Sequence, residues 1–99
     1  MSSASEGVAL VTGAAQGIGR AIALQLADKF DVAVNDIPCN EQALNSLVAE
    51  ITAKGRRSFA LLADVSVEDQ VKDMVSSVVT ELGGLNVVRT VAPLHPSLH

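Results

Sequence analysis

Short apolar runs alternate with amphipathic segments along most of this chain. The apolar runs, of which Val8 to Val11 is the first, are typical of strands that are covered on both faces. The segments between them carry apolar residues three and four positions apart, as Leu44, Leu47, Val48 and Ile51 do, and this spacing is typical of helices with one buried face. From the pattern we predict four strands, at residues 8–11, 32–35, 58–63 and 85–88, and three helices, at residues 17–28, 40–54 and 67–82.

The ends of two predicted helices carry residues that favour helix termini. Asn40 is expected to cap the second helix, and Ser66, with Asp69 three residues later, forms a capping-box pattern for the third. Gly55 and Gly83 follow the last apolar positions of these helices, so we expect the helices to end there.

Strands that alternate with helices predict a parallel sheet in an α/β fold. Because crossovers between parallel strands are right-handed, we expect the strand order 3-2-1-4. The helices at 17–28 and 40–54 would then lie on one face and the helix at 67–82 on the other, which would be half covered. The outer edge of the fourth strand would be bare and rich in valine, so we expect loose packing, self-association through this strand or rapid degradation.

The two ends of the chain lack the pattern. Residues 1–6 are small and polar, and we expect them to be disordered, whereas residues 7–88 carry the predicted fold. Residues 89–99 contain two prolines and two histidines without any period, and we expect an irregular tail. His95 and His99 have no further ligands beside them, so we expect no metal site.

Composition narrows the classes of partner. The net charge of −4 and the isoelectric point near 4.9 argue against a nucleic-acid partner, and Lys54, Arg56 and Arg57 are expected to face the negative end of the second helix and solvent. No apolar run approaches the roughly 20 residues that a membrane span needs. The single cysteine, Cys39, cannot form an internal disulfide, and we expect a buried or incidental thiol in a cytoplasmic protein.

A glycine-rich turn from Thr12 to Gly19 joins the first predicted strand to the first helix. In this position Gly13 permits a tight turn, Gly17 permits backbone approach to a diphosphate, and Gly19 permits close packing of the helix on the strand. The free N–H groups at the helix start would hold the phosphates. The alternative is a turn without a ligand, but the spacing and the flanking elements favour a dinucleotide.

Asp36 ends the second predicted strand, seventeen residues after Gly19. A carboxylate there can accept hydrogen bonds from both ribose hydroxyls of the adenosine, and it repels a 2′-phosphate. Neither Ile37 nor Gln16, which lies inside the turn, supplies a cation to pair with such a phosphate. We therefore predict NAD as the cofactor. The alternative is that Asp36 only begins a turn.

Together with Asp64 and Val65 after the third predicted strand, the glycine turn and Asp36 resemble the short-chain dehydrogenase/reductase family. The resemblance runs from about residue 8 to residue 88 and implies a Rossmann fold. Within the family, the sequence of this segment most resembles microbial acetoin or diacetyl reductases.

The resemblance also implies roles for single residues. Asp64 would contact the adenine amino group, Val65 would pack beside the ring, and Ile18 would lie near the diphosphate together with Gly17. The alternative for Asp64 is a loop acid that precedes the Ser66 cap.

The chain departs from the family after the fourth predicted strand. The family usually has Asn-Asn-Ala-Gly where Thr90 to Pro93 stand here, and Arg89 occupies a position expected to be apolar. The family's catalytic Asn, Ser and Tyr-x-x-x-Lys do not follow, and the chain has no tyrosine.

We therefore interpret the chain as a truncated Rossmann half. Its parent would transfer a hydride between NAD(H) and an alcohol or ketone, and we expect the chain alone to be inactive. The alternative is a non-catalytic module that binds a dinucleotide or regulates a partner. A methyltransferase with an adenosyl cofactor is disfavoured by the glycine spacing.

Overall fold

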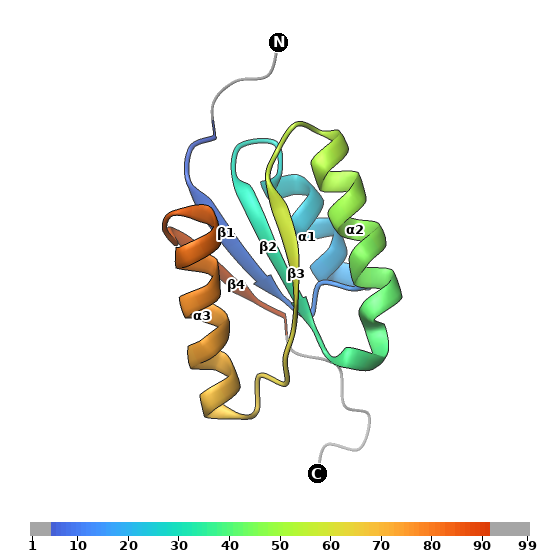
Figure 1. The fold of residues 1–99 in the computed structure, drawn as a ribbon. Coiled ribbons are helices and arrows are strands. Elements are labelled where there is room, and N and C mark those ends of the chain that lie inside the picture. Colours follow the sequence, from blue (N-terminus) through green and yellow to red (C-terminus); the bar gives the residue numbers. More distant parts are fainter. Residues whose placement is uncertain (1–4, 92–99) are drawn as a thin grey trace.

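The computed structural model describes residues 5–91, which form a parallel sheet between helices (Figure 1). In chain order the elements are β1 (Val8–Thr12), α1 (Gly17–Leu26), β2 (Asp31–Asp36), the 3₁₀ turn η1 (Pro38–Asn40), α2 (Glu41–Ala53), β3 (Ser58–Leu62), α3 (Glu68–Leu82) and β4 (Val87–Thr90). Neighbouring strands are parallel, and their order is β3-β2-β1-β4. The predicted fold class and strand order are confirmed.

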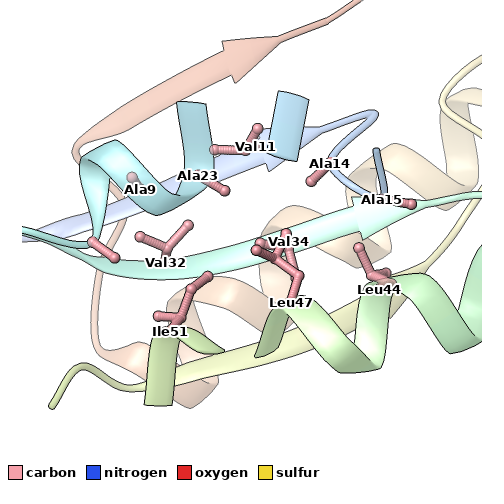
Figure 2. Close-up of a cluster of buried hydrophobic side chains, with 11 residues drawn as sticks. Ala9, Val11, Ala14, Ala15, Ala23, Val32, Val34, Leu44, Leu47 and Ile51 are labelled. Atoms are coloured by element: carbon pink, nitrogen blue, oxygen red, sulfur yellow. The ribbon is translucent and has the colours of Figure 1, made fainter. Parts of the chain in front are cut away.

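Helices α1 and α2 cover one face of the sheet, as predicted (Figure 1). Figure 2 shows how the aliphatic side chains of β1 and β2 meet those of the two helices in one cluster. The stripe predicted for α2 lies in this cluster, where Leu44, Leu47 and Ile51 are fully buried and Val48 is partly buried. Full burial of each such side chain contributes roughly 1.5–3 kcal/mol to stability.

Helix α3 covers the opposite face, and in the described part of the chain it is the one helix there. Its buried residues Met74, Val78 and Leu82 pack over Leu10 of β1 and Ala33 of β2. This confirms the predicted division of the helices between the two faces. At 15 residues α3 is also the longest described helix, and no helix in the described part is long and apolar enough to cross a membrane.

The fourth strand begins two residues later than predicted. The N–H of Asn86 donates to the carbonyl of Val8 at 2.8 Å, and its Oδ1 accepts a hydrogen bond from the Val8 N–H at 2.9 Å. The side chain thus replaces a backbone carbonyl, and regular pairing starts at Val87. Arg89 lies within β4 opposite Val11, so the predicted start of an irregular tail at residue 89 is wrong. Its side chain is exposed because β4 is an edge strand.

The expected disorder of residues 1–6 is wrong for the last two. Ser5 Oγ accepts a hydrogen bond from the Asp31 N–H at 3.2 Å, and the Glu6 N–H donates to the carbonyl of Lys29 at 2.6 Å. Both contacts tie the chain before β1 to the start of β2. The remainder of the two predicted ends, residues 1–4 and 92–99 with the two histidines, lies outside the described residues.

Asn40 holds the predicted N-cap position of α2 but makes no capping hydrogen bond, and the predicted Ser66 cap of α3 is wrong. Both predicted helix ends are right, since α2 ends just before Gly55, which has φ of 91°, and α3 ends at Gly83. Asn40 precedes α2, but its amide nitrogen donates to Asp36 and not to the helix backbone. Val67 precedes α3, and the hydroxyl of Ser66 donates to a loop carboxylate. Gly83 ends α3 with φ of 86°, a left-handed conformation that favours glycine.

Arg56 and Arg57, which were expected to face the end of α2, contact the ends of α1 and α3 instead. The buried guanidinium of Arg56 donates to the carbonyls of Ala27 at 3.0 Å and Asp28 at 2.6 Å, directly after α1. Arg57 donates to the carbonyl of Leu82, at the end of α3, at 3.0 Å. The negative ends of α1 and α3 are therefore both stabilised from the turn between α2 and β3.

Candidate functional site

The turn from β1 to α1 depends on glycine in two ways. Gly13 and Gly17 have φ of 66° and 62°, in the left-handed region that other residues rarely adopt. Gly19 does not have positive φ, but a Cβ on it would overlap the carbonyl group of Gly13. Helix α1 therefore begins very close to the end of β1, as predicted from the glycine spacing.

The first turn of α1 is open to an anion. Gln16 precedes the helix with extended backbone, and no described side chain caps the helix start. The first turn of α1 contains no acidic residue among its described positions, so the backbone N–H groups and the positive end of the helix dipole are free to receive negative charge. Ile18 is 71% exposed beside this opening, which is unusual for a large apolar side chain.

Asp36, at the end of β2, contacts the glycine turn. Its Oδ2 accepts a hydrogen bond from the Ala15 N–H at 2.9 Å, and its Oδ1 accepts from the Ile37 N–H and from Asn40 Nδ2, both at 2.8 Å. A carboxylate has about four acceptor positions, so one position remains on Oδ2. Asp36 thus links β2, the glycine turn and η1 while it keeps one acceptor position for a ligand.

Asp64 and Val65 lie in the exposed loop between β3 and α3. Asp64 Oδ1 accepts hydrogen bonds from the hydroxyl of Ser66 at 2.7 Å and from its N–H at 2.9 Å, and these bonds hold the pKa of Asp64 below its usual range. The Asp64 N–H donates to Gln70 Oε1 at 2.7 Å. The contacts with Ser66 are those expected if Asp64 only stabilises the loop before α3. Within the described residues, however, Oδ2 of this ionised carboxylate accepts no hydrogen bond and is open to a ligand.

One cavity of about 760 Å³ joins these segments at the carboxyl ends of the strands. Eight of the nine residues predicted to hold the dinucleotide line it, namely Gly13, Gln16, Gly17, Ile18, Asp36, Ile37, Asp64 and Val65. Gly19 does not line the cavity, because it lies behind the turn, where it allows α1 to approach. The glycine turn, the end of β2 and the loop after β3 meet here because the carboxyl ends of parallel strands lie at the same edge of the sheet.

Five further residues that were not predicted from the sequence line this cavity, namely Asn35, Asn40, Ala63, Ser66 and Val91. Asn35 is buried, and its Nδ2 donates to the carbonyls of Leu61 at 2.9 Å and Ala63 at 3.2 Å, which joins the ends of β2 and β3. A polar residue at the end of an apolar strand is the signal that could have found it. The contact of Asn40 depends on η1, which the pattern did not predict.

The ionisable groups of the cavity are acidic. Among the described residues that line it, Asp36 and Asp64 alone are ionisable. Arg20 does not line the cavity and pairs with Glu50 of α2. In residues 5–91 no three His, Cys, Asp or Glu side chains are grouped to hold a metal ion. Cys39 is exposed, so the buried alternative for this thiol is wrong. A smaller cavity of about 280 Å³, between β3 and α3, contains none of the predicted residues.

Comparison with known proteins identifies the family. The sequence profile of the short chain dehydrogenases matches residues 7–97. The chain belongs to the short-chain dehydrogenase family. The match continues beyond residue 88, where the resemblance noted from the motifs ends, so the likeness extends further than predicted.

Two curated members of the short-chain dehydrogenase family show how much of a relative this chain spans. It is 60% identical over 88 residues to a short-chain dehydrogenase/reductase of Armillaria gallica. The matched segment is 87% of this chain and 34% of the relative. It is 52% identical over 81 residues to a 3-oxoacyl-(acyl-carrier-protein) reductase of Staphylococcus aureus. The matched segment is 81% of this chain and 32% of the relative. The chain thus spans about a third of these relatives. The nearer resemblance to acetoin or diacetyl reductases stays a prediction.

Solved structures share the fold. A blue fluorescent protein from a metagenomic library, in complex with NADPH, has a TM-score of 0.80 and 37% identity over 85% of this chain and 35% of its own. A short chain dehydrogenase from Burkholderia cenocepacia J2315, in complex with NADP, has a TM-score of 0.75 and 43% identity over 81% of this chain and 33% of its own. The sheet and helices of this chain are therefore the first part of a Rossmann fold of this family.

Proposed function

We propose that this chain binds NAD and forms the nucleotide-binding N-terminal part of a short-chain oxidoreductase. The observation that carries the proposal is the single cavity in which an uncapped helix start, two left-handed glycines and the carboxylate of Asp36 meet. This arrangement matches a dinucleotide, which offers a diphosphate to backbone N–H groups and a ribose to a carboxylate.

The glycine turn would hold the diphosphate. Gly13 and Gly17 both line the cavity and present backbone without a side chain to a ligand. Gln16 and Ile18 border the same opening, and Gly19 lets α1 pack close enough for its N–H groups to reach the cavity. The helix dipole favours the negative charge of the diphosphate.

The adenosine would lie between the ends of β2 and β3. Asp36 offers its remaining acceptor position to a ribose hydroxyl, and Ile37 supplies apolar surface beside it. On the other side, Asp64 Oδ2 can accept a hydrogen bond from the adenine amino group, while the exposed Val65 packs against the ring.

NAD fits this cavity better than NADP. A 2′-phosphate needs an Arg or Lys partner, and the described residues that line the cavity include neither. It would also approach the carboxylate of Asp36, and two like charges at close range are unfavourable. The two related structures hold NADPH and NADP, so the preference proposed here rests on the side chains of this chain alone.

The proposed reaction of the whole protein is hydride transfer between NAD(H) and an alcohol or ketone. When bound, the nicotinamide group supplies or accepts the hydride. The carbonyl oxygen also needs a positioned proton donor, and the 99 residues of this chain contain no tyrosine. We propose that the chain alone binds the dinucleotide without catalysing the reaction, and that it resides in the cytoplasm.

Self-association through β4 is a further part of the proposal. In the described residues β4 pairs only with β1, so one row of its backbone groups has no partner strand. Val88 in this strand is 53% exposed. Unpaired edges with apolar side chains favour pairing with a second copy.

Isothermal titration of the purified chain with NAD⁺ and NADP⁺ tests the proposed function. We expect saturable binding with NAD⁺ tighter than NADP⁺. Ile37→Arg places a cation beside Asp36, so it should tighten NADP⁺ binding by about tenfold through a charge-assisted hydrogen bond to the phosphate. Val67→Arg adds the same charge to an exposed loop position outside the cavity and should leave the NADP⁺ affinity unchanged. Absence of saturable binding of both dinucleotides would refute the proposal.

A further inference from the structure

The hydrogen bonds of Asp36 divide into two kinds. Two of its three donors, the N–H groups of Ala15 and Ile37, belong to the backbone and are present whatever side chains stand there. The third donor is the side chain of Asn40, whose Nδ2 lies 2.8 Å from Oδ1. Asn40 is therefore the donor that a substitution can remove, and it borders the same cavity.

The side chain of Asn40 serves this contact and does not cap the helix. Although Asn40 stands directly before α2, its side chain makes no capping hydrogen bond to the helix backbone. Its own N–H donates to the carbonyl of Ile37 at 3.0 Å, which closes η1 and brings the amide over the end of β2. The 3₁₀ turn thus holds a side-chain donor against the carboxylate.

We propose that Asn40 is a specificity-determining positioning residue that keeps the site selective against a 2′-phosphate. This inference rests on the proposed function. With three donors, the carboxylate of Asp36 is fixed where a 2′-phosphate would have to lie, and it can turn away only when all three charge-assisted bonds break. Without Asn40, Oδ1 keeps only the N–H of its neighbour Ile37, so the carboxylate turns aside more easily.

The three bonds also limit how Asp36 binds a sugar. Oδ1 already accepts two hydrogen bonds, and Oδ2 accepts one. One acceptor position of about four remains on Oδ2, where a ribose hydroxyl can bind while all three bonds are kept.

The test compares Asn40→Ala with Asn45→Ala, a matched change at an exposed position of α2. Titration calorimetry gives the dissociation constants of NAD⁺ and NADP⁺ for both variants and the unchanged chain. We expect the ratio of the NADP⁺ constant to the NAD⁺ constant to fall by about tenfold in Asn40→Ala, the effect of one charge-assisted hydrogen bond. Asn45→Ala should keep the original ratio.

A merely structural role for Asn40 would give another result. In that case Asn40→Ala would weaken both dinucleotides in the same proportion, and an unchanged ratio would overturn the inference while the proposed function survives. If the unchanged chain bound neither dinucleotide, the proposed function itself would fail. Asn40→Leu, which keeps most of the side-chain volume but has no donor, should repeat the ratio of Asn40→Ala and provides a second folded variant for the comparison.

Discussion

At the scale of single residues, the site depends on atoms that are missing as much as on atoms that are present. Gly19 shows this, because its backbone is ordinary and its value lies in the absent Cβ, which would meet the carbonyl group of Gly13 and approach Ala14 Cα to 3.1 Å. Both neighbours are backbone atoms, which cannot turn aside as a flexible side chain can. The distance between β1 and α1 is therefore set by this glycine.

Gly19→Ala is expected to lower the free energy of unfolding by about 2 kcal/mol. Alanine is the better helix former by about 1 kcal/mol, but overpacking against rigid backbone costs about 3 kcal/mol, the upper end of the usual range, so a net loss of about 2 kcal/mol remains. Urea unfolding measures the loss. Gly84→Ala meets no atom within 4 Å and serves as the control. Equal stabilities of the two variants would contradict the packing role of Gly19.

At the scale of elements, the helices are stabilised at their ends by residues of other elements. The turn between α2 and β3 supplies Arg56 to the end of α1 and Arg57 to the end of α3. Lys54 adds an ion pair with Asp28 at 2.9 Å, and its hydrogen bond holds the pKa of Asp28 below the usual range. Because Arg56 is buried and Lys54 is partly exposed, loss of the Arg56 cation should lower the free energy of unfolding more than loss of the Lys54 cation.

Arg56→Met is expected to lower the free energy of unfolding by roughly 2–3 kcal/mol, because the carbonyls of Ala27 and Asp28 lose charge-assisted hydrogen bonds in a partly buried place. Methionine keeps most of the length of the side chain, so the change isolates the guanidinium. Chemical denaturation of Lys54→Met, which removes an exposed charge from the same turn, gives the comparison. A loss in Arg56→Met no larger than in Lys54→Met would contradict this assignment.

At the scale of the whole molecule, the two faces of the sheet are unequally covered. In the described part, eleven buried residues form the cluster under α1 and α2, and seven form the cluster under α3. Val88 pairs in register with Leu10, which belongs to the second cluster, yet half of Val88 is exposed. Apolar surface therefore remains accessible at the β4 edge as well as at the cavity, where Ile18 is exposed.

Val88→Lys is expected to reduce the self-association proposed for β4, because a charged side chain on an edge strand opposes pairing with a second copy. Light scattering coupled to gel filtration measures the mass of the chain over a range of concentrations. Ser46→Lys adds the same charge on the exposed side of α2 and should leave the mass unchanged. A chain that stays monomeric without any substitution would remove this part of the proposal.

Much of the fold could be predicted because it depends on local periodicity and on a general rule of handedness. Apolar runs and helical stripes predicted the ends of all four strands and all three helices to within two residues. The right-handedness of crossovers predicted the strand order. The start of β4 was missed because Asn86 uses its side chain as a backbone carbonyl, a contact with Val8 that no local pattern records.

For the candidate site, the sequence by itself determined the glycine turn and the acid at the end of β2, since both follow from short motifs next to strands. Only the tertiary structure decided what those groups contact. Asp36 is bonded to Ala15, 21 residues away, and Arg56 to Ala27, 29 residues away, so their partners depend on how distant segments meet. Local sequence fixes which conformations are favourable, whereas hydrogen-bond partners of polar side chains are chosen when packing brings remote donors and acceptors together.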